Sequence, residues 1–341
     1  MTPTPTTERS NMPHADPAPS LRVGIVGTGG ISRSHAPGWL ETGAQLHCFS
    51  LSGAPEFAEQ FGARIHDSLD SLLAAVDVVD ICSPTPVHAE QVRAALDAGK
   101  DVVCEKPMAL STEDAQELAT RAERAGRLLL PAHVVRCFPQ YATAKAAIDR
   151  GAIGQIAVLR FERPGSFPTQ PWFGDESQSG GIVMDQMIHD MDQAVWMAGP
   201  VERVYAQQST SSATDTVRTA HVVLTHTSGV ISHCRGLWGP PGTAFRYTFD
   251  LAGDAGKLQY DSAADTGIVF DAVAASRQSS GDGFLPDVTT IRSPYTEEIL
   301  EFAAAIRGET TARVSAADGA YAVQISRAAL ESIATGRSIA C

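Results

Sequence analysis

The beginning of the chain passes from an apolar strand pattern through a glycine turn into a helical pattern that ends near Leu40. The strand pattern covers residues 21–26, and the turn after it reads Gly27-Thr28-Gly29-Gly30-Ile31-Ser32. In a βαβ unit such a turn lets the backbone approach a pyrophosphate, which the N-terminus of the following helix attracts. An ordinary strand–helix turn has the same glycines, but the strand before it and the helix after it favour dinucleotide binding. We therefore expect the cofactor to contact Gly27, Thr28, Gly29, Gly30 and Ile31.

Strand and helix patterns alternate with short turns up to residue 137. Strands are predicted over residues 44–50, 63–66, 77–82, 101–104 and 127–135. Helices are predicted over residues 55–61 and 87–98 and after the N-cap Ser111. This rhythm is typical of an α/β protein with a doubly wound, parallel Rossmann sheet, which we place at residues 21–137. Residues 1–20 are rich in Pro and Thr and predict a disordered tail.

The pattern changes after residue 141. Apolar and polar residues alternate in five segments, at residues 156–161, 201–207, 221–224, 230–237 and 245–253. Helices are predicted over residues 141–150, 182–197, 295–306 and 315–335, and residues 262–288 read as a loop. These patterns predict an α+β domain over residues 138–341, with a large, open and mostly antiparallel sheet.

A lysine follows the buried strand pattern of residues 101–104, in the sequence Glu105-Lys106-Pro107. Ligands of doubly wound sheets bind outside the carboxyl ends of the strands, so we expect this ammonium group to face a cofactor. Pro107 restricts the backbone of Lys106 and thereby aims its side chain. A surface lysine that happens to end a strand is the alternative.

The predicted helix over residues 182–197 carries Asp185 and His189, four residues apart and therefore on one face. A carboxylate beside an imidazole orients the ring, as a general base requires. These two residues predict proton abstraction from an alcohol, while Lys106 stabilises the developing alkoxide. The alternative is a local ion pair on the helix surface. This chemistry requires no metal ion, and it divides the active site between the two domains.

Composition and charge narrow the class of protein. The chain has 341 residues and a formal net charge of −13 without a basic run, which argues against nucleic acid and anionic membranes as partners. The six cysteines form no C-x-x-C pair, and no apolar run is long enough to span a bilayer. We expect a cytoplasmic enzyme that acts on a small molecule.

The sequence resembles the Gfo/Idh/MocA family, named for glucose–fructose oxidoreductase, inositol dehydrogenase and rhizopine catabolism proteins. The resemblance covers nearly all of residues 21–339 and rests on the glycine turn, residues 83–88, Glu105-Lys106-Pro107 and the block at residues 180–192. It implies NAD(P)-dependent oxidation or reduction of sugars and polyols, and a homodimer or homotetramer joined through the C-terminal sheet. By this resemblance Lys106 bonds the reacting hydroxyl, His189 takes its proton, and Asp185 holds the histidine.

Other positions are expected to contact the cofactor or the substrate. Ser83, Pro84, His88 and Glu105 are expected at the cofactor beside Lys106, although His88 also reads as a helix N-terminal residue without a ligand. Glu105 either orients the lysine or satisfies the loop backbone.

Arg136 and Trp172 are expected at the substrate. The resemblance assigns Arg136 to substrate hydroxyls, and a salt-bridging arginine at the end of a strand is the alternative. Trp172 offers an apolar face that suits a sugar ring.

Residues 47–53 bear on the choice between NAD and NADP. NAD enzymes usually place Asp or Glu about twenty residues after the glycines, and this window holds neither. Ser50 and Ser52 suit a 2′-phosphate, but Leu51 stands where an arginine would select NADP, and Arg33 is the nearest other arginine. The cofactor is therefore predicted as NAD or NADP, with a slight preference for NADP.

These observations predict an oxidoreductase that moves hydride between a nicotinamide cofactor and a hydroxyl or carbonyl carbon of a sugar, polyol or derivative. One alternative is redox-neutral cleavage of a glycoside, in which tightly held NAD oxidises a carbon transiently. Another is a regulator that senses a sugar or dinucleotide without catalysis. A copurifying cofactor with no net absorbance change would indicate the first alternative, and binding without turnover would indicate the second.

Overall fold

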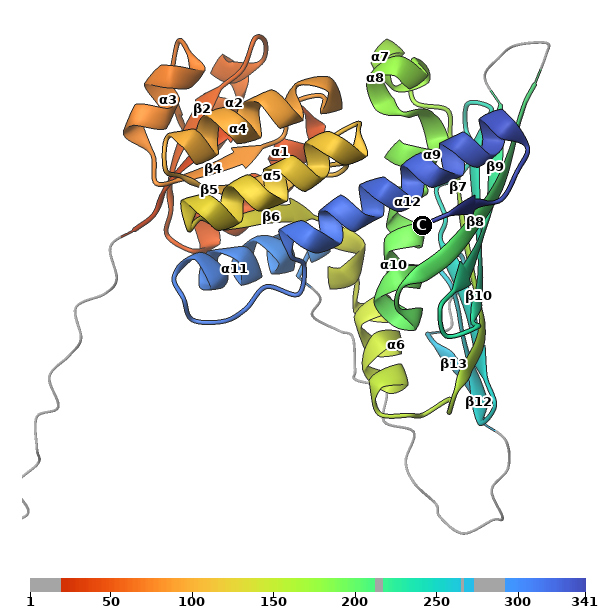
Figure 1. Cartoon of the computed structure of the whole chain (residues 1–341). Helices are drawn as coiled ribbons and strands as arrows, with labels where there is room; N and C mark the ends of the chain where they lie inside the picture. The colour runs from red at the N-terminus through yellow and green to blue at the C-terminus, as the bar shows by residue number, and fades with distance from the viewer. Residues whose placement is uncertain (1–19, 212–216, 265–266, 273–291) are drawn as a thin grey trace, which may run out of the picture.

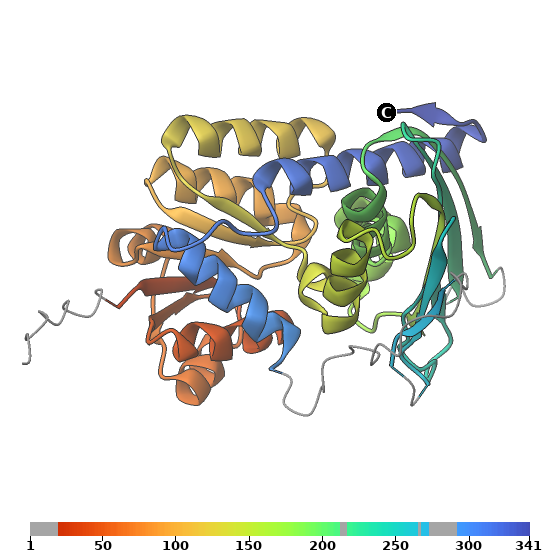
Figure 2. The ribbon, with the colours of Figure 1, turned by 90° about the horizontal axis from the view of Figure 1, so that it is seen from below.

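The computed structural model describes residues 20–211, 217–264, 267–272 and 292–341. The predicted tail before residue 20 and most of the predicted loop over residues 262–288 lie outside the described residues. Two sheets, each packed against helices, form two lobes that meet at a central cleft (Figures 1 and 2). Within the described part of the chain, no helix has the length and apolar character needed to cross a membrane.

The first sheet consists of six parallel strands in the order β3-β2-β1-β4-β5-β6. Its strands are β1 (Arg22–Val26), β2 (Gln45–Phe49), β3 (Arg64–Ile65), β4 (Val78–Ile81), β5 (Asp101–Glu105) and β6 (Leu129–Ala132). Its helices are α1 (Gly30–Glu41), α2 (Ala54–Phe61), α3 (Leu69–Ala75), α4 (His88–Asp97) and α5 (Thr112–Ala125). Every residue of β4 is buried, as expected for a central strand that is covered on both faces. The predicted doubly wound Rossmann sheet is confirmed.

The second sheet has eight strands in the order β13-β12-β11-β7-β10-β9-β8-β14. Its strands are β7 (Ile156–Ser166), β8 (Val201–Thr210), β9 (Arg218–His226), β10 (Ile231–Gly239), β11 (Thr248–Gly253), β12 (Gly256–Asp261), β13 (Val269–Ala272) and β14 (Ile339–Ala340). Strand β10 pairs with β7 in parallel, and the other neighbours pair antiparallel. The predicted large and mostly antiparallel sheet is confirmed.

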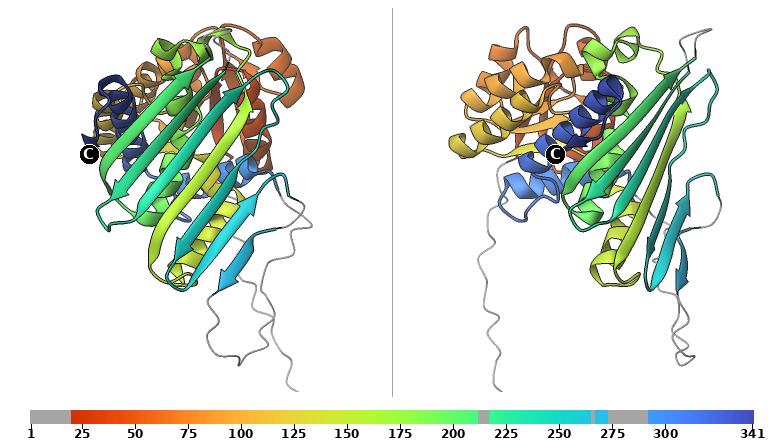
Figure 3. Two further views of the ribbon diagram at one scale, coloured as in Figure 1. Left: turned by 90° about the vertical axis from the view of Figure 1, so that its right-hand side faces the viewer. Right: turned by 45° about the vertical axis from the view of Figure 1, so that its right-hand side comes forward.

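Helices pack on one face of this second sheet. The helices of the second half are α6 (Pro139–Asp149), α7 (Pro171–Gly174), α8 (Glu176–Ser179), α9 (Gly181–Asp185), α10 (Ile188–Ala198), α11 (Pro294–Ile306) and α12 (Ala316–Thr335). Along β10, Ser232 and Cys234 are buried while His233 and Arg235 are exposed, because successive side chains point to opposite faces. No described helix covers the outer face (Figure 3). The homo-oligomer contact that the resemblance assigns to this sheet stays a prediction.

Several helices and strands of the structure were not predicted from the sequence. The short elements α3, α7, α8, β12 and β14 were not predicted, and β13 lies within the predicted loop. Most have few residues, so the pattern of apolar positions is too short to identify them.

The last two long helices return toward the first sheet. Helix α11 packs on α1, where a side chain at Gly38 would meet Ile299 at 2.7 Å, so the glycine permits the close approach. Ile299 and Phe302 share a buried cluster with Trp39 of α1. Helix α12 contacts both α5 and β8 (Figure 1). The C-terminal helices thus tie the two lobes together, although the sequence predicted them within the second domain.

The predicted continuous helix over residues 182–197 is wrong. The chain forms α9 and α10, separated at Gln186 and Met187, where the Met187 N–H donates to the Ile182 carbonyl at 2.9 Å. Met187 packs against Gly236 of β10. A Cβ at Gly236 would lie only 2.6 Å from the Met187 Cγ, so the glycine leaves room for this side chain. The break places Asp185 and His189 on different helices.

A buried ion pair fixes the start of α10 to the second sheet. The Arg163 guanidinium of β7 donates to the Asp190 carboxylate at 2.7 Å through Nη2 and at 3.2 Å through Nε. Arg163 also lies 3.4 Å from the Tyr141 hydroxyl. Asp190 is completely buried, and it follows His189 directly, so the pair determines where that histidine stands.

Replacing Arg163 with Met is expected to lower the free energy of unfolding by about 3–5 kcal/mol, because Asp190 is left as an unpaired buried charge. The double variant Arg163→Met/Asp190→Leu is expected to regain most of this loss, since two apolar side chains replace the pair. Urea unfolding followed by circular dichroism measures both effects. A single variant as stable as the unmodified protein would contradict this account of how α10 is held.

Candidate active site

A cleft lies between the two lobes, at the carboxyl ends of β1, β4 and β5. Its lining includes Gly27–Ile31, Ser50, Ser52, Gly53, Cys82–Thr85, His88, Glu105, Lys106, Val134, Gln170, Trp172, Phe173, Asp185, His189 and Tyr295. Strands β1 and β4 are neighbours although the chain leaves β1 toward β2, so the cleft occupies the switch point of the sheet. Ligands of open α/β sheets bind at this position.

The glycine turn leaves room for a dinucleotide. Gly27 has a φ of +88°, and a side chain there would meet the Ser83 backbone at 2.7 Å. At Gly29 and Gly30 a Cβ would meet no described atom within 4 Å, so the backbone is open to a ligand. Among the described residues no side chain caps the N-terminus of α1. Its free N–H groups and its dipole suit a pyrophosphate, so the residues present fit the implied cofactor.

The turn after β2 is held by its own serines. The Ser50 hydroxyl accepts the Thr28 N–H at 3.3 Å and donates to the Ser52 carbonyl at 2.7 Å. The Thr28 hydroxyl donates to the same carbonyl at 2.8 Å. Leu51 is 98% exposed, and the Arg33 guanidinium donates to Gln60. The Ser50 hydroxyl is thus engaged within the protein.

Lys106 reaches across the cleft from the end of β5. Its Nζ donates to the Asp185 main-chain carbonyl at 2.8 Å and lies 3.2 Å from the Asp185 Oδ1. Both side chains are 16% exposed, and the Lys106–Pro107 peptide bond is cis. The sequence paired Asp185 with His189. In the structure the Asp185 carboxylate contacts Lys106 instead, and Asp185 ends α9 while His189 belongs to α10.

His189 faces the cleft and is half-buried. Its Nδ1 is buried and has no hydrogen-bond partner among the described residues. Burial lowers the pKa of His189 well below its ordinary value, and the positive charges of Lys106 and Arg163 lower it further. The imidazole is therefore neutral near pH 7 and is able to accept a proton.

The residues predicted around the nicotinamide end all line the cleft, and two of them also support its backbone. The Glu105 Oε2 accepts the Lys106 N–H at 3.1 Å. The ring nitrogens of His88 lie 2.9 Å from the Pro107 carbonyl and 2.7 Å from the Ser83 carbonyl. His88 thus joins the loop after β4 to the loop after β5, and both of its nitrogens are occupied.

Arg136 is placed differently from the prediction. Its guanidinium is 2% exposed and binds the Asp192 carboxylate at 2.9 and 2.6 Å and the Arg313 carbonyl at 2.9 Å. It does not belong to the described lining of the cleft, so the salt-bridge alternative describes its position.

Trp172 lies in the lining of the cleft, where the sequence placed it. It stacks on Phe173 with ring centroids 3.8 Å apart, and its Nε1 donates to Gln170 at 2.9 Å. Its part in substrate binding stays a prediction.

The sequence analysis missed several lining residues, among them Thr85, Val134 and Tyr295. Thr85 and Val134 follow strands β4 and β6, and their types carry no chemical signal of their own. Tyr295 stands at the start of α11, far along the chain from every motif. Only the packing of α11 on α1 brings it to the cleft, so no local pattern identifies it.

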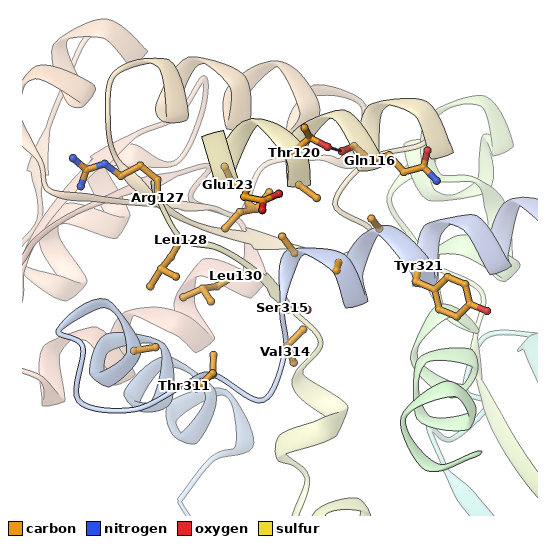
Figure 4. Close-up of a pocket in the computed structure, with 18 of the residues that line it drawn as sticks. Gln116, Thr120, Glu123, Arg127, Leu128, Leu130, Thr311, Val314, Ser315 and Tyr321 are labelled. Carbon is orange, nitrogen blue, oxygen red and sulfur yellow. Dashed lines mark hydrogen bonds between the residues drawn. The ribbon is translucent and has the colours of Figure 1, made fainter. Parts of the chain in front are cut away.

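A second hollow lies outside the edge of the first sheet, between α5, β6 and the start of α12 (Figure 4). Leu128, Leu130 and Val314 form part of its wall, with Glu123 and Arg127 also in the lining. None of the predicted site residues lines it. The groups with the chemistry for proton and hydride transfer are gathered in the central cleft.

Comparison with known proteins agrees with this geometry. The chain is 28% identical to myo-inositol 2-dehydrogenase of Thermotoga maritima over 340 residues, which are 94% of this chain and 98% of that protein. It is 34% identical to D-glucoside 3-dehydrogenase of Escherichia coli over 190 residues, which are 52% of this chain and 54% of that protein. The crystal structure of GenD2 from gentamicin A biosynthesis, in complex with NAD, has the same fold. It has a TM-score of 0.82 and 24% identity, and covers 97% of this chain and 99% of its own.

Two family models match the chain. The model of the oxidoreductase family with an NAD-binding Rossmann fold matches residues 21–133, and the GFO/IDH/MocA C-terminal domain matches residues 141–259. Together they cover more than half of the chain, and they confirm the functional class predicted from the glycine turn, Lys106 and His189. This chain therefore belongs to the Gfo/Idh/MocA family of nicotinamide-dependent oxidoreductases.

Proposed function

We propose that this protein is an NAD-dependent dehydrogenase that interconverts a secondary hydroxyl and a ketone on a sugar or cyclic polyol. The proposal rests mainly on one observation. The Lys106 ammonium group and the neutral His189 imidazole both line the cleft beside the glycine turn. Relatives named myo-inositol 2-dehydrogenase and D-glucoside 3-dehydrogenase support a ring hydroxyl as the reacting group. Trp172 supplies the apolar surface that such a ring packs against.

Lys106 stabilises charge on the reacting oxygen. The hydroxyl oxygen gains negative charge as its proton leaves, and an ammonium group beside it lowers the energy of that state. The Asp185 carboxylate and carbonyl hold the ammonium group in place by two contacts from the other lobe. Asp185 therefore acts as a positioning residue for Lys106.

His189 takes the proton. Its imidazole is already neutral, because burial and the neighbouring positive charges disfavour the imidazolium. The same charges help to return the proton when the reaction runs toward the alcohol. Bound NAD supplies the hydride acceptor, and the residues that would hold it are those of the glycine turn and the loops after β2, β4 and β5.

We propose NAD rather than NADP as the preferred cofactor. The family model is described as NAD-binding. A 2′-phosphate requires cationic or hydrogen-bonding partners, whereas the Ser50 hydroxyl is engaged with Thr28 and Ser52, and Leu51 stands in the position for an arginine. The preference for NADP predicted from the sequence relied on Ser50 and Ser52 as free donors.

Replacing Lys106 with Met is expected to lower kcat/KM by roughly 10²–10³-fold, because the developing alkoxide loses its charge partner. The absorbance of reduced nicotinamide, followed over a panel of cyclitols and glucosides, measures the rate. Lys100→Met is the matched control: Lys100 precedes β5 at its opposite end and donates to the Val76 carbonyl, so its loss should leave the rate unchanged. A Lys106→Met variant as fast as the unmodified enzyme would refute the proposed mechanism.

The pKa of His189 is expected to rise toward its ordinary value in Lys106→Met, because the removed positive charge helps to depress it. It should stay below that value, since burial persists. NMR titration of labelled histidine rings, assigned with His189→Gln, measures the shift. The control Lys100→Met should leave the pKa of His189 unchanged. An unchanged His189 titration in Lys106→Met would show that the two groups do not interact.

NAD is expected to bind at least roughly ten-fold more tightly than NADP, since residues 50–53, directly after β2, hold no lysine or arginine to balance a 2′-phosphate. Calorimetric titration of the unmodified protein with each dinucleotide measures both dissociation constants. Ser52→Arg is expected to narrow the difference by supplying the missing charge. Tighter binding of NADP by the unmodified protein would contradict the proposed preference.

A further inference from the structure

A buried polar cluster lies beneath the cleft, and the proposed mechanism makes no use of it. His35 and Trp39 come from α1 and Asp80 from β4, and all three have no exposed surface. Cys82 follows β4 and adjoins them. Helix α1 begins at the glycine turn, so the cluster stands directly behind the cofactor side of the cleft.

Asp80 fixes the orientation of His35. Its Oδ2 accepts the Trp39 Nε1–H at 2.7 Å and lies 3.0 Å from the His35 Nδ1, while the Cys82 thiol donates to Oδ1 at 3.4 Å. The ligand atoms of His35, Asp80 and Cys82 lie within 4.8 Å of one another, a spacing that also occurs in metal sites. Here the donors already satisfy the carboxylate, so hydrogen bonding accounts for the spacing.

The other nitrogen of His35 faces Glu105. Nε2 lies 3.2 Å from the Glu105 Oε1 and has no hydrogen-bond partner among the described residues. The Glu105 Oε2 accepts the N–H of Lys106. Glu105 is 7% exposed and lines the cleft. A chain of three side chains, Asp80–His35–Glu105, thus runs from the core to the cleft and ends beside the reacting lysine.

The charges in this cluster are complementary. Burial by itself lowers the pKa of His35, but Asp80 and Cys82 raise it well above its ordinary value, so the ring is an imidazolium at neutral pH. Burial raises the pKa of the nearby Glu298 well above its ordinary value, so this carboxyl group is neutral at pH 7. One imidazolium consequently stands between two carboxylates, and the carboxylate on the side of the cleft is Glu105.

We propose that His35 is a positioning residue that fixes the Glu105 side chain at the cleft beside Lys106, and thereby raises the affinity for the oxidised dinucleotide relative to the reduced one. The inference rests on the proposed function, because it requires the dinucleotide to bind in this cleft. The oxidised nicotinamide ring carries a positive charge and the reduced ring carries none. A fixed carboxylate beside the ring therefore favours the oxidised form.

The test compares dissociation constants rather than rates. His35→Gln removes the partner that holds Glu105 in place, and is expected to weaken NAD⁺ binding roughly ten-fold while NADH binding changes by less than about three-fold. Loss of the imidazolium charge by itself would strengthen NAD⁺ binding, so a weakening reports displacement of the Glu105 carboxylate. Glu105→Gln is expected to change the ratio of the two constants by a similar factor. The double variant His35→Gln/Glu105→Gln should be no worse than Glu105→Gln, because His35 acts through Glu105.

Trp39→Phe is the matched control. It removes another hydrogen bond to Asp80 without touching Glu105, so it should lower Tm but leave the NAD⁺/NADH ratio unchanged. An unchanged ratio in His35→Gln, or additive effects in the double variant, would overturn the positioning role.

If His35→Gln does not fold, an unchanged ratio in Glu105→Gln overturns the inference by itself, and a changed ratio supports it. An unmodified protein that binds neither dinucleotide refutes the proposed function and the inference with it. Binding of both forms, with a ratio that the variants leave unchanged, refutes the inference alone.

Discussion

The contact between Lys106 and Asp185 joins the two lobes at the point where chemistry is expected. Lys106 reaches the cleft because β5 ends there, and Asp185 reaches it because α9 ends there. Two contacts, at 2.8 and 3.2 Å, hold the ammonium group between a dinucleotide-binding sheet and a half-buried histidine. The contact therefore links the end of strand β5 in the first lobe to the end of helix α9 in the second lobe.

Two buried ion pairs hold α10 and therefore His189. Arg163 binds Asp190 from the second sheet, and Arg136 binds Asp192 from the segment after β6. Both arginines are 2% exposed, and their charges are balanced inside the protein. The charged side chains that line the cleft include Lys106, Asp185 and Glu105. Buried pairs thus supply the geometry, and partly accessible groups supply the chemistry.

Much of the fold could be predicted from the sequence. The buried parallel strands appear in the sequence as apolar runs, and the glycine turn identifies the first βαβ unit. The alternation of apolar and polar residues identifies the strands of the second sheet. The sequence also placed Lys106 at the end of a parallel strand and His189 after a Gly-Gly entry, and both residues line the cleft. These features depend on residues that are close together in the chain.

The features that the sequence did not reveal depend on distant residues. Met187, at the break between α9 and α10, packs into the space beside Gly236 on β10, and Asp185 at the end of α9 pairs with Lys106 from the other lobe. Tyr295 reaches the cleft only because α11 packs on α1. The resemblance assigned Arg136 to the substrate, but in the folded chain Asp192 lies close enough to bind it. Long-range packing settles each of these cases.

We propose that hydride passes between a substrate carbon and the nicotinamide ring in the central cleft. The most direct test incubates the unmodified protein with NAD⁺ and a cyclitol or glucoside deuterated at the reacting carbon. We expect one reduced, deuterated nicotinamide for each ketone formed. Product formed without any net reduced nicotinamide, or binding of both ligands without turnover, would contradict it.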